Sequence, residues 1–394
     1  MRACITRRIS FTIAVFALLN LVAPQLDAAK AAAYSVTNLG TLGGASSVAL
    51  GINNFGEVVG YSETTAKQNH AFLYLVGTSL LDLGTLGGPD SYASRISDSG
   101  VLVGHAAIPD GRMRAFIAVV GSSELFDLSS LDVRLDGPYS TTSGINRAGQ
   151  VVGYTYTPGG SGDTHGGKGV SKHAFLYSDH KITDLGTFGG TDGFVTAIND
   201  SGQMIGYFMP KSVPGIAYMP IRAFLYSSNK LVELGTLGRS VTTPTDINDL
   251  GQVVGYGQIP GGRTHAFSYS GGRMKDLATL AGGSQSYAYG INNSGHVVGA
   301  SESADLTLHA FLYTEGVMQD LNKLIPTNSG WLLSEARDIN DSGQIVGVGV
   351  ANGQKRAFVL TPLLPHSADA LRARLIRSTV AGKRPRYQLT NSLQ

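Results

Sequence analysis

The chain has 394 residues, 52 of them glycine, and only 15% are charged, against roughly 25% in an average globular protein. A hydrophobic content of 42% excludes an intrinsically disordered chain, and many glycines with few charges favour an all-β protein rich in tight turns. The net charge of +2 conceals an acidic body, because residues 1–31 carry +3 and residues 366–394 carry +5, which leaves −6 for the rest. An acidic body argues against nucleic acid as a partner.

The N-terminus predicts a secretory signal peptide over residues 1–31. Basic residues at positions 2, 7 and 8 precede an apolar stretch at 9–23, which is too short for a comfortable membrane span and is followed by small residues. Cys4, the sole cysteine, precedes this stretch and is lost on cleavage, so the mature chain has no thiol chemistry. We therefore expect a secreted protein, extracellular or periplasmic, with no transmembrane segment in the mature chain.

One phrase then recurs seven times: Ile, Asn (once Ser), two variable residues and Gly. The copies begin at Ile52, Ile96, Ile145, Ile198, Ile247, Ile291 and Ile339. Spacings of 44 to 53 residues indicate an array of supersecondary units. Asn-x-x-Gly is typical of a type I turn whose Gly takes a positive φ and closes a β-hairpin. A calcium loop is disfavoured, because alternating carboxylates are missing and Arg147 would occupy a ligand position.

Each unit contains four short strand patterns, and seven such units predict an all-β, seven-bladed β-propeller of four-stranded antiparallel blades over residues 32–365. The last unit stops near Pro362 after its third strand, whereas the first unit is preceded by an unpaired strand pattern at 34–44. We therefore predict that the N-terminal strand completes the last blade and closes the ring without a free edge.

The third strand of every unit carries His or Arg before an Ala-Phe pair, and the fourth ends in an acidic residue. The basic positions are His70, Arg114, His173, Arg222, His265, His309 and Arg356; the acidic ones are Asp82, Asp127, Asp184, Glu233, Asp276 and Asp320, with Asn38 facing Arg356. We expect charge-assisted hydrogen bonds across each hairpin. Metal binding is the weaker alternative, because the seven blades hold the histidines apart.

These phrases resemble the HAF-repeat family of bacterial extracellular proteins. The matching segments are 70–74, 173–177 and 309–313 (His-Ala-Phe-Leu-Tyr), together with 82–88 and 184–190 (Asp-Leu-Gly-Thr-Leu/Phe-Gly-Gly). The resemblance covers roughly residues 34–362 and implies an exported bacterial repeat protein. It implies no established activity and therefore transfers no catalytic positions. The basic tail at 366–394, which we expect to be flexible or a short helix, departs from relatives that end in an anchoring segment.

Departures from the repeat locate a candidate ligand site. The longest connections between second and third strands lie in blades 3 and 4, and the longest between fourth and first strands lead into blades 3 and 7. Candidate ligand-binding residues on this face are Asp132, Arg134, Asp136, Tyr139, Tyr156, Asp163, His165, Lys168, Tyr207, Lys211, Tyr218 and Trp331. Aromatic and polar groups at a concave mouth suit glycan or peptide binding. Tolerated insertions, with Trp331 in the core, are the alternative.

No catalytic motif is recognisable, and the Asp163–His165 pair alone is weak evidence. We therefore expect a non-catalytic binding or cell-surface structural module without cofactor or metal, monomeric, whose partner is a glycan, a peptide or a cell-surface component. The alternative is a polysaccharide-active lyase or hydrolase on a propeller scaffold.

Overall fold

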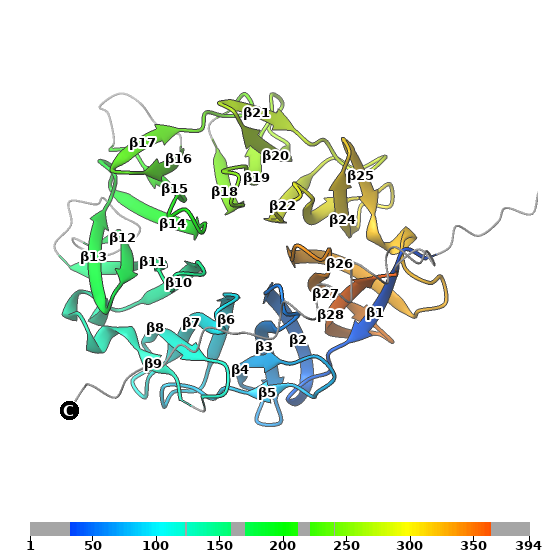
Figure 1. Cartoon of the computed structure of the whole chain (residues 1–394). Helices are drawn as coiled ribbons and strands as arrows, with labels where there is room; N and C mark the ends of the chain where they lie inside the picture. Colours follow the sequence, from blue (N-terminus) through cyan, green and yellow to red (C-terminus); the bar gives the residue numbers. More distant parts are fainter. Residues whose placement is uncertain (1–31, 123, 159–169, 212–220, 240, 364–394) are drawn as a thin grey trace, which may run out of the picture. The chain divides into compact units, whose positions relative to one another are not determined.

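The computed structural model describes residues 32–122, 124–158, 170–211, 221–239 and 241–363. The expected signal peptide and basic tail lie outside these residues. The described residues form seven four-stranded antiparallel sheets that surround a central axis as the blades of a β-propeller (Figure 1). The fold predicted from the repeats is confirmed. Within the described residues, no helix has the length and apolar character needed to cross a membrane.

In every blade the strands are hydrogen-bonded in a row, with the strand before the Asn-x-x-Gly turn closest to the axis. Blade 1 contains β2 (Gly43–Ile52), β3 (Val58–Thr64), β4 (Asn69–Tyr74) and β5 (Leu81–Asp82). Blade 2 contains β6 (Ser91–Ile96), β7 (Val101–Ala107), β8 (Met113–Val119) and β9 (Phe126–Asp127). Blade 3 contains β10 (Ser140–Ile145), β11 (Val151–Pro158), β12 (Val170–Ser178) and β13 (Lys181–Gly186). Blade 4 contains β14 (Asp192–Ile198), β15 (Met204–Met209), β16 (Arg222–Ser227) and β17 (Lys230–Glu233).

The remaining blades repeat this order. Blade 5 contains β18 (Thr242–Ile247), β19 (Val253–Gln258), β20 (Thr264–Ser270) and β21 (Arg273–Asp276). Blade 6 contains β22 (Ser286–Ile291), β23 (Val297–Glu302), β24 (Leu308–Thr314) and β25 (Val317–Asp320). Blade 7 contains β26 (Trp331–Ile339), β27 (Ile345–Ala351), β28 (Gln354–Pro362) and β1 (Tyr34–Asn38). Three 3-10 turns, η1 (Leu128–Ser130), η2 (Val133–Asp136) and η3 (Leu321–Lys323), lie in the long connections into blades 3 and 7.

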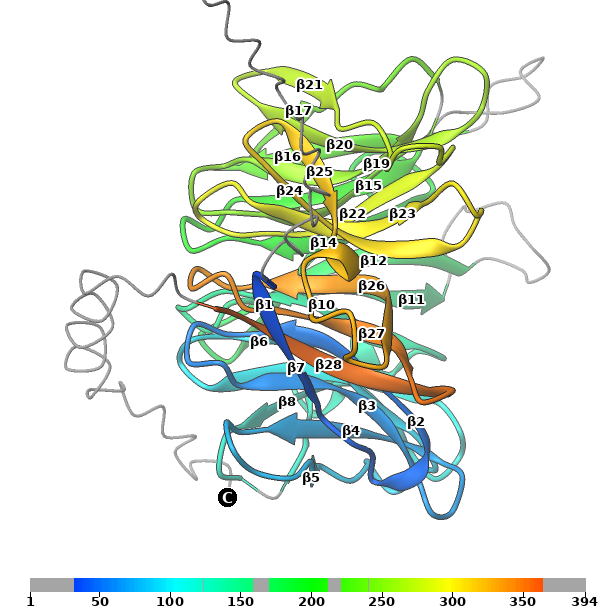
Figure 2. The same ribbon diagram turned by 90° about the vertical axis from the view of Figure 1, so that its right-hand side faces the viewer.

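The ring closes through β1, as predicted. This strand pairs antiparallel with β28, from Tyr34 opposite Pro362 to Asn38 opposite Phe358, and so becomes the outermost strand of blade 7 (Figure 2). The backbone N–H of Leu363 also donates to the carbonyl of Ala33 at 2.8 Å. The pairing gives β28 a hydrogen-bonded partner on both sides, so blade 7 gains the fourth strand that its own unit lacks.

The Ala-Phe phrase and the glycine of the second strand form the packing unit of each blade. The buried phenylalanines are Phe72, Phe116, Phe175, Phe224, Phe267, Phe311 and Phe358. Phe72 lies opposite Gly60, where an added Cβ would sit 2.0 Å from the carbonyl oxygen of Val48 and 3.0 Å from the phenylalanine ring. Glycine is therefore required because the ring and the inner strand both approach the backbone closely.

The hydrogen bonds predicted between the third and fourth strands form in five blades. His70–Asp82, His265–Asp276 and His309–Asp320 have Nδ1–O distances of 2.9 Å, His173–Asp184 of 3.1 Å, and Arg222–Glu233 an Nη1–O distance of 2.8 Å. The other two predicted pairs were wrong. Arg114 instead contacts Asp136 and the carbonyl of Gly137, which the longer connection into blade 3 brings within reach. Arg356 binds the carbonyl of Ala45, while the side chain of Asn38 accepts from Gly40.

The closure yields a test. Deleting residues 34–40 exposes the edge of β28 and should lower the melting temperature by 10 °C or more or cause aggregation, since an unpaired edge strand promotes association. Moving residues 34–43 behind residue 363 through a short turn should restore melting, because Tyr34 already faces Pro362 and the pairing needs no particular chain connection. The measurement is the melting temperature of the two variants and of the full chain. Unchanged melting of the deletion variant contradicts the closure.

Candidate functional site in the central channel

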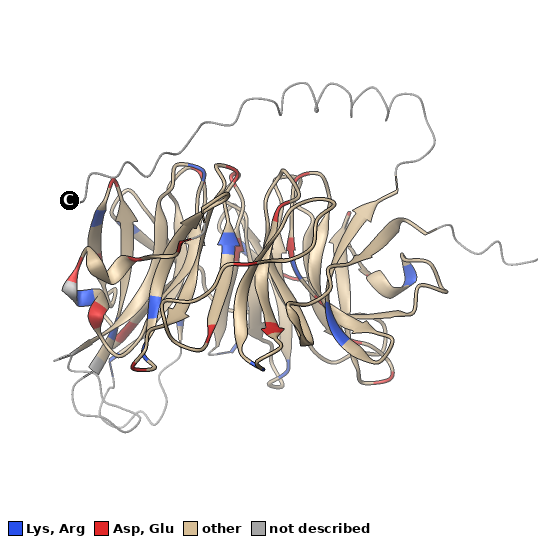
Figure 3. Ribbon diagram, turned by 90° about the horizontal axis from the view of Figure 1, so that it is seen from below, with Lys and Arg blue, Asp and Glu red and all other residues tan. Residues whose placement is uncertain are grey.

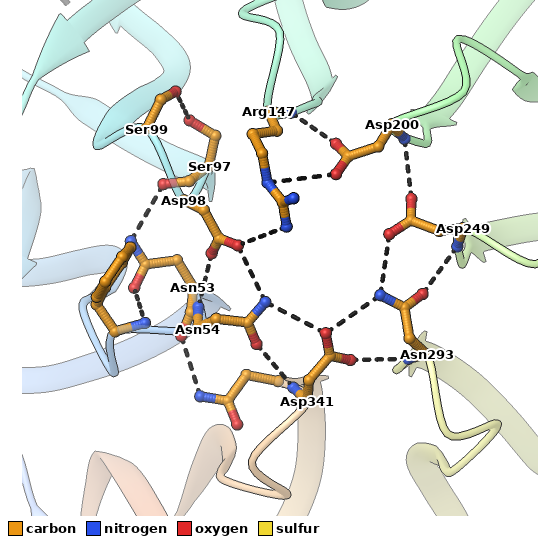
Figure 4. Close-up of polar contacts among 12 residues, drawn as sticks. Asn53, Asn54, Ser97, Asp98, Ser99, Arg147, Asp200, Asp249, Asn293 and Asp341 are labelled. Carbon is orange, nitrogen blue, oxygen red and sulfur yellow. Dashed lines mark hydrogen bonds and ion pairs between the residues drawn. The ribbon is translucent and has the colours of Figure 1, made fainter. Parts of the chain in front are cut away.

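The Asn-x-x-Gly turns gather at one end of the channel and line a polar basin of about 180 Å³. Each turn is closed as predicted: in blade 1 the N–H of Gly56 donates to the carbonyl of Asn53 at 3.0 Å, and the glycine has φ +77°. The seven equivalent glycines all have φ between +73° and +80°. The basin is therefore made by seven copies of one turn facing the axis (Figure 4).

The first residues of these turns form a buried hydrogen-bonded circle. The side-chain amide of Asn248 donates to the carbonyl of Asn292 in the next blade at 3.0 Å. Equivalent bonds start from Asn53, Asn146, Asn199, Asn292 and Asn340, at 3.0 or 3.1 Å. Each amide thus satisfies a buried carbonyl of its neighbour, which links six of the seven blade junctions.

The second residues form another circle around the basin, which we call the turn ring: Asn54, Asp98, Arg147, Asp200, Asp249, Asn293 and Asp341. The backbone N–H of one member donates to the side-chain oxygen of the next, as from Asp200 to Asp249 at 3.0 Å. Five further junctions repeat this bond at 2.7 to 2.9 Å (Figure 4). With four carboxylates and one guanidinium the turn ring carries a formal charge of −3.

Both circles change between blades 2 and 3. Ser97 replaces the asparagine of the buried circle and binds Ser99 of its own turn at 2.8 Å. Arg147 offers no side-chain acceptor, so it cannot receive the backbone N–H of Asp98. Instead its guanidinium contacts Asp98 at 3.1 Å and Asp200 at 3.5 Å. An ion pair therefore substitutes for hydrogen bonds at this junction.

Two carboxylates, Asp246 and Asp338, lie next to the turns, and the guanidinium of Arg95 is near enough to act on both. Asp246 of blade 5 accepts the backbone N–H of Ile291 in blade 6 at 2.9 Å, and Asp338 of blade 7 accepts that of Ile52 in blade 1 at 3.0 Å. Enclosure by the blades removes water and raises the pKa of Asp246 to about 7; Arg95 opposes this rise and Asp338 adds to it. The pKa of Asp338 is raised by the same enclosure.

Aromatic side chains on or next to the two inner strands make up a second feature, which is separate from the residues that line the basin. We call one continuous series, in blades 1 to 4, the aromatic row: Tyr61, Tyr92, His105, Tyr139, Tyr154, Phe194 and Tyr207. Successive ring centroids are 4.7 to 6.1 Å apart, and Tyr156 joins it edge-on against Tyr139 at 5.7 Å. Most members lie about four residues, roughly 13 Å, along the strands from the turns.

The aromatic row is half-buried and uncharged at neutral pH. Most of its rings keep part of their surface exposed, whereas Phe194 is buried. Burial raises the pKa of Tyr154 and raises that of Tyr207 to about 12, and it lowers the pKa of His105 to about 4. The row therefore presents neutral rings with phenolic hydroxyl groups, which suits a ligand with apolar faces and hydroxyl groups.

Several residues expected at the site lie in or beside this row. Tyr139 and Tyr156 contact each other, and Tyr207 stacks on Phe194 with centroids 4.7 Å apart. Asp132 and Arg134 pair at 2.5 Å at the start of η2, and Asp136 binds Arg114. Two of these expected residues, Tyr139 and Tyr207, therefore belong to the row, Tyr156 packs against it, and the other three are held in ion pairs.

The other expected residues are placed differently. Lys211 follows β15 and is exposed. Trp331 begins β26 and packs edge-on against Phe358, with centroids 5.9 Å apart, beside the core of blade 7. Asp163, His165, Lys168 and Tyr218 lie outside the described residues. A ligand-binding role for the twelve stays a prediction.

Sequence reasoning missed most of the aromatic row and the interblade role of the turns. A signal was present, because the residue after the second-strand glycine is aromatic or His in five blades: Tyr61, His105, Tyr154, Tyr207 and Tyr256. The turn ring also had a signal in the sequence, because the first variable position of the turn is Asp in four of the seven copies. In the part of the chain that the structure describes, no three His, Cys, Asp or Glu side chains are grouped to hold a metal ion.

Comparisons with known proteins bear on the fold alone. Residues 190–361, which span blades 4 to 7, match a family model described as "Protein of unknown function (DUF3466)". No curated protein matches the chain. Similar solved structures include an acylaminoacyl peptidase from Pyrococcus horikoshii (TM-score 0.53, 9% identity, 84% of this chain and 54% of that one). A puromycin-hydrolyzing peptidase from Mycobacterium tuberculosis is similar to the same degree (TM-score 0.53, 11% identity, 84% and 55%). The chain thus spans about half the length of these peptidases.

The buried circle can be tested by exchanging its two residue types. Asn248→Ser should keep a local hydroxyl acceptor but lose the bond to Asn292, at a cost of about 1 kcal/mol in the free energy of unfolding. Ser97→Asn should complete the circle at the one junction that lacks this bond and stabilise the protein by a similar amount. Denaturant unfolding of both variants measures the difference. If both substitutions changed the free energy of unfolding in the same direction and by the same amount, the buried circle would not be a source of stability.

The raised pKa of Asp246 predicts a pH dependence. The folded protein holds this proton more tightly than the unfolded chain, whose Asp pKa is near 4. The free energy of unfolding should therefore fall as pH rises from about 4 to about 7 and then level off, since the stability contributed by the protonated carboxyl is lost over this range. Asp246→Asn should flatten the fall, and Asp338→Asn should move it to lower pH. Equal slopes in the wild type and Asp246→Asn would contradict the assignment.

Proposed function

We propose that this chain is an exported, non-catalytic binding protein whose ligand is a glycan held on the aromatic row. The observation that carries the proposal is the unbroken series of rings from Tyr61 to Tyr207, most of them partly exposed. Buried tyrosines that only fill a core need no such exposure. Tyrosines with an accessible face and a polar edge are typical of binding surfaces.

A sugar matches this surface in two respects. The C–H face of a pyranose is flat and apolar and can pack on a ring, while its hydroxyl groups can exchange hydrogen bonds with the phenols. Because burial raises the pKa of the row's tyrosines, their hydroxyl groups stay protonated and can donate as well as accept. Acidic and basic residues are intermingled over the described blades (Figure 3), which gives no extended basic face for a nucleic acid.

Export is the second part of the proposal. It is supported by the N-terminal pattern and by the resemblance of the repeated phrases to the HAF-repeat family. The resemblance of the propeller to those of two peptidases supports only the fold, so no peptidase activity is carried over.

The test is a glycan array followed by titration calorimetry on the ligands it identifies. Tyr154→Ala and Tyr207→Ala should each weaken binding about tenfold or more, which corresponds to about 1.4 kcal/mol. Tyr313→Ala is the matched control, because Tyr313 is also half-buried but lies on β24, outside the row. The Tyr313→Ala variant should bind the glycan with the affinity of the wild type.

Three results would overturn the proposal. Equal affinity in all variants would place the ligand elsewhere. Release of shortened or unsaturated sugars during incubation would make the protein a hydrolase or lyase. Binding confined to a peptide library would show that the row recognises peptides.

A further inference from the structure

Lys172 extends along the edge of the aromatic row. It lies in β12 opposite Tyr156, and its ammonium is 5.2 Å from the ring centroids of both Tyr156 and Phe194. Its backbone N–H donates to Asp192 at 2.8 Å, at the start of β14. The side chain is half-buried and is held between blades 3 and 4.

The charge of Lys172 is not neutralised by an ion pair within the described residues. The nearby basic residues Arg112, Arg114 and Arg134 each contact a carboxylate. Among the described groups no carboxylate forms an ion pair with the ammonium of Lys172, and Asp192 contacts this residue through its backbone N–H. The faces of two rings offset a positive charge only partly, so the ammonium still attracts an anion.

Arg337, in blade 7, also lies over an aromatic ring but differs from Lys172 in having a carboxylate partner. Its guanidinium lies 4.6 Å from the ring centroid of Tyr289, but it also pairs with Glu335 on the same strand. A cation over a ring there is neutralised by the protein itself. At Lys172 no carboxylate of the described residues supplies this charge, so a ligand can supply it.

We propose that the glycan is acidic, with a carboxylate or sulfate group beside Lys172 and its sugar ring packed on the neighbouring aromatic side chains. This inference rests on the proposed function and adds the chemical class of its ligand. The proposal needs both the ion contact and the ring contact. An ion pair with a fully exposed lysine would add little affinity in water. Partial burial beside two rings makes the same contact stronger.

The experiment compares ligands that differ in charge alone. The probes are an oligogalacturonate and its fully methyl-esterified form, with a sulfated and an unsulfated galactan as a second pair. The wild type should bind the charged member of at least one pair about tenfold more tightly, and this preference should shrink as salt rises. Lys172→Gln should abolish the preference and leave the affinity for the neutral member unchanged.

Lys275→Gln is the matched control, because Lys275 also lies over a tyrosine ring, 5.4 Å from the centroid of Tyr313, but outside the row. It should keep the wild-type preference. Equal wild-type binding of charged and neutral probes would overturn the inference while the proposed glycan function stands. Loss of both affinities in Lys172→Gln would also overturn it, since that is the effect of a lysine that only positions rings. If no glycan binds, the proposed function falls with it.

Discussion

The structure depends on each blade satisfying the buried polar groups of the next. The amide of Asn248 fills the carbonyl of Asn292, and the same bond recurs around the ring until Asn340 returns to Asn53. An open ring would leave such groups unpaired at its two ends, and each buried unpaired group costs about 1–3 kcal/mol. The requirement therefore favours a closed ring, and β1 completes blade 7 by pairing with β28.

The same requirement explains why the junction of blades 2 and 3 differs. Ser97 and Arg147 remove one bond from each circle there. At this junction the long connection through η1 and η2 adds the buried Leu135 and the contacts of Arg114 with Asp136 and Gly137. The residues that distinguish this connection also bring Tyr139 between His105 and Tyr154. The departure from symmetry and the central part of the aromatic row are one feature of the chain.

Local patterns revealed the elements, the turn glycines and the completion of blade 7, because each depends on residues close in the chain or on counting units. Partners across blades could not be derived in the same way, since Asn248 meets Asn292 only after closure. The pair Arg114–Asp127 was mispredicted because the insertion that follows Asp127 supplies other partners for Arg114, namely Asp136 and the carbonyl of Gly137. The aromatic residues after the second-strand glycines were visible, but their contacts depend on how neighbouring blades face each other.

The turn ring has the greater charge, yet its carboxylates are less available to a ligand than the single ammonium of Lys172. Asp341 accepts backbone and side-chain bonds from Asn293 on its two oxygens, and Asp249 accepts a backbone bond from Asp200 and a side-chain bond from Asn293. Such oxygens stabilise the ring and would have to give up bonds to hold a cation. The aromatic row differs, because its neutral rings form no closed circle of hydrogen bonds and most of them keep part of their surface exposed. The row is therefore the better candidate for ligand recognition, because fewer of its polar groups are used in holding the ring together.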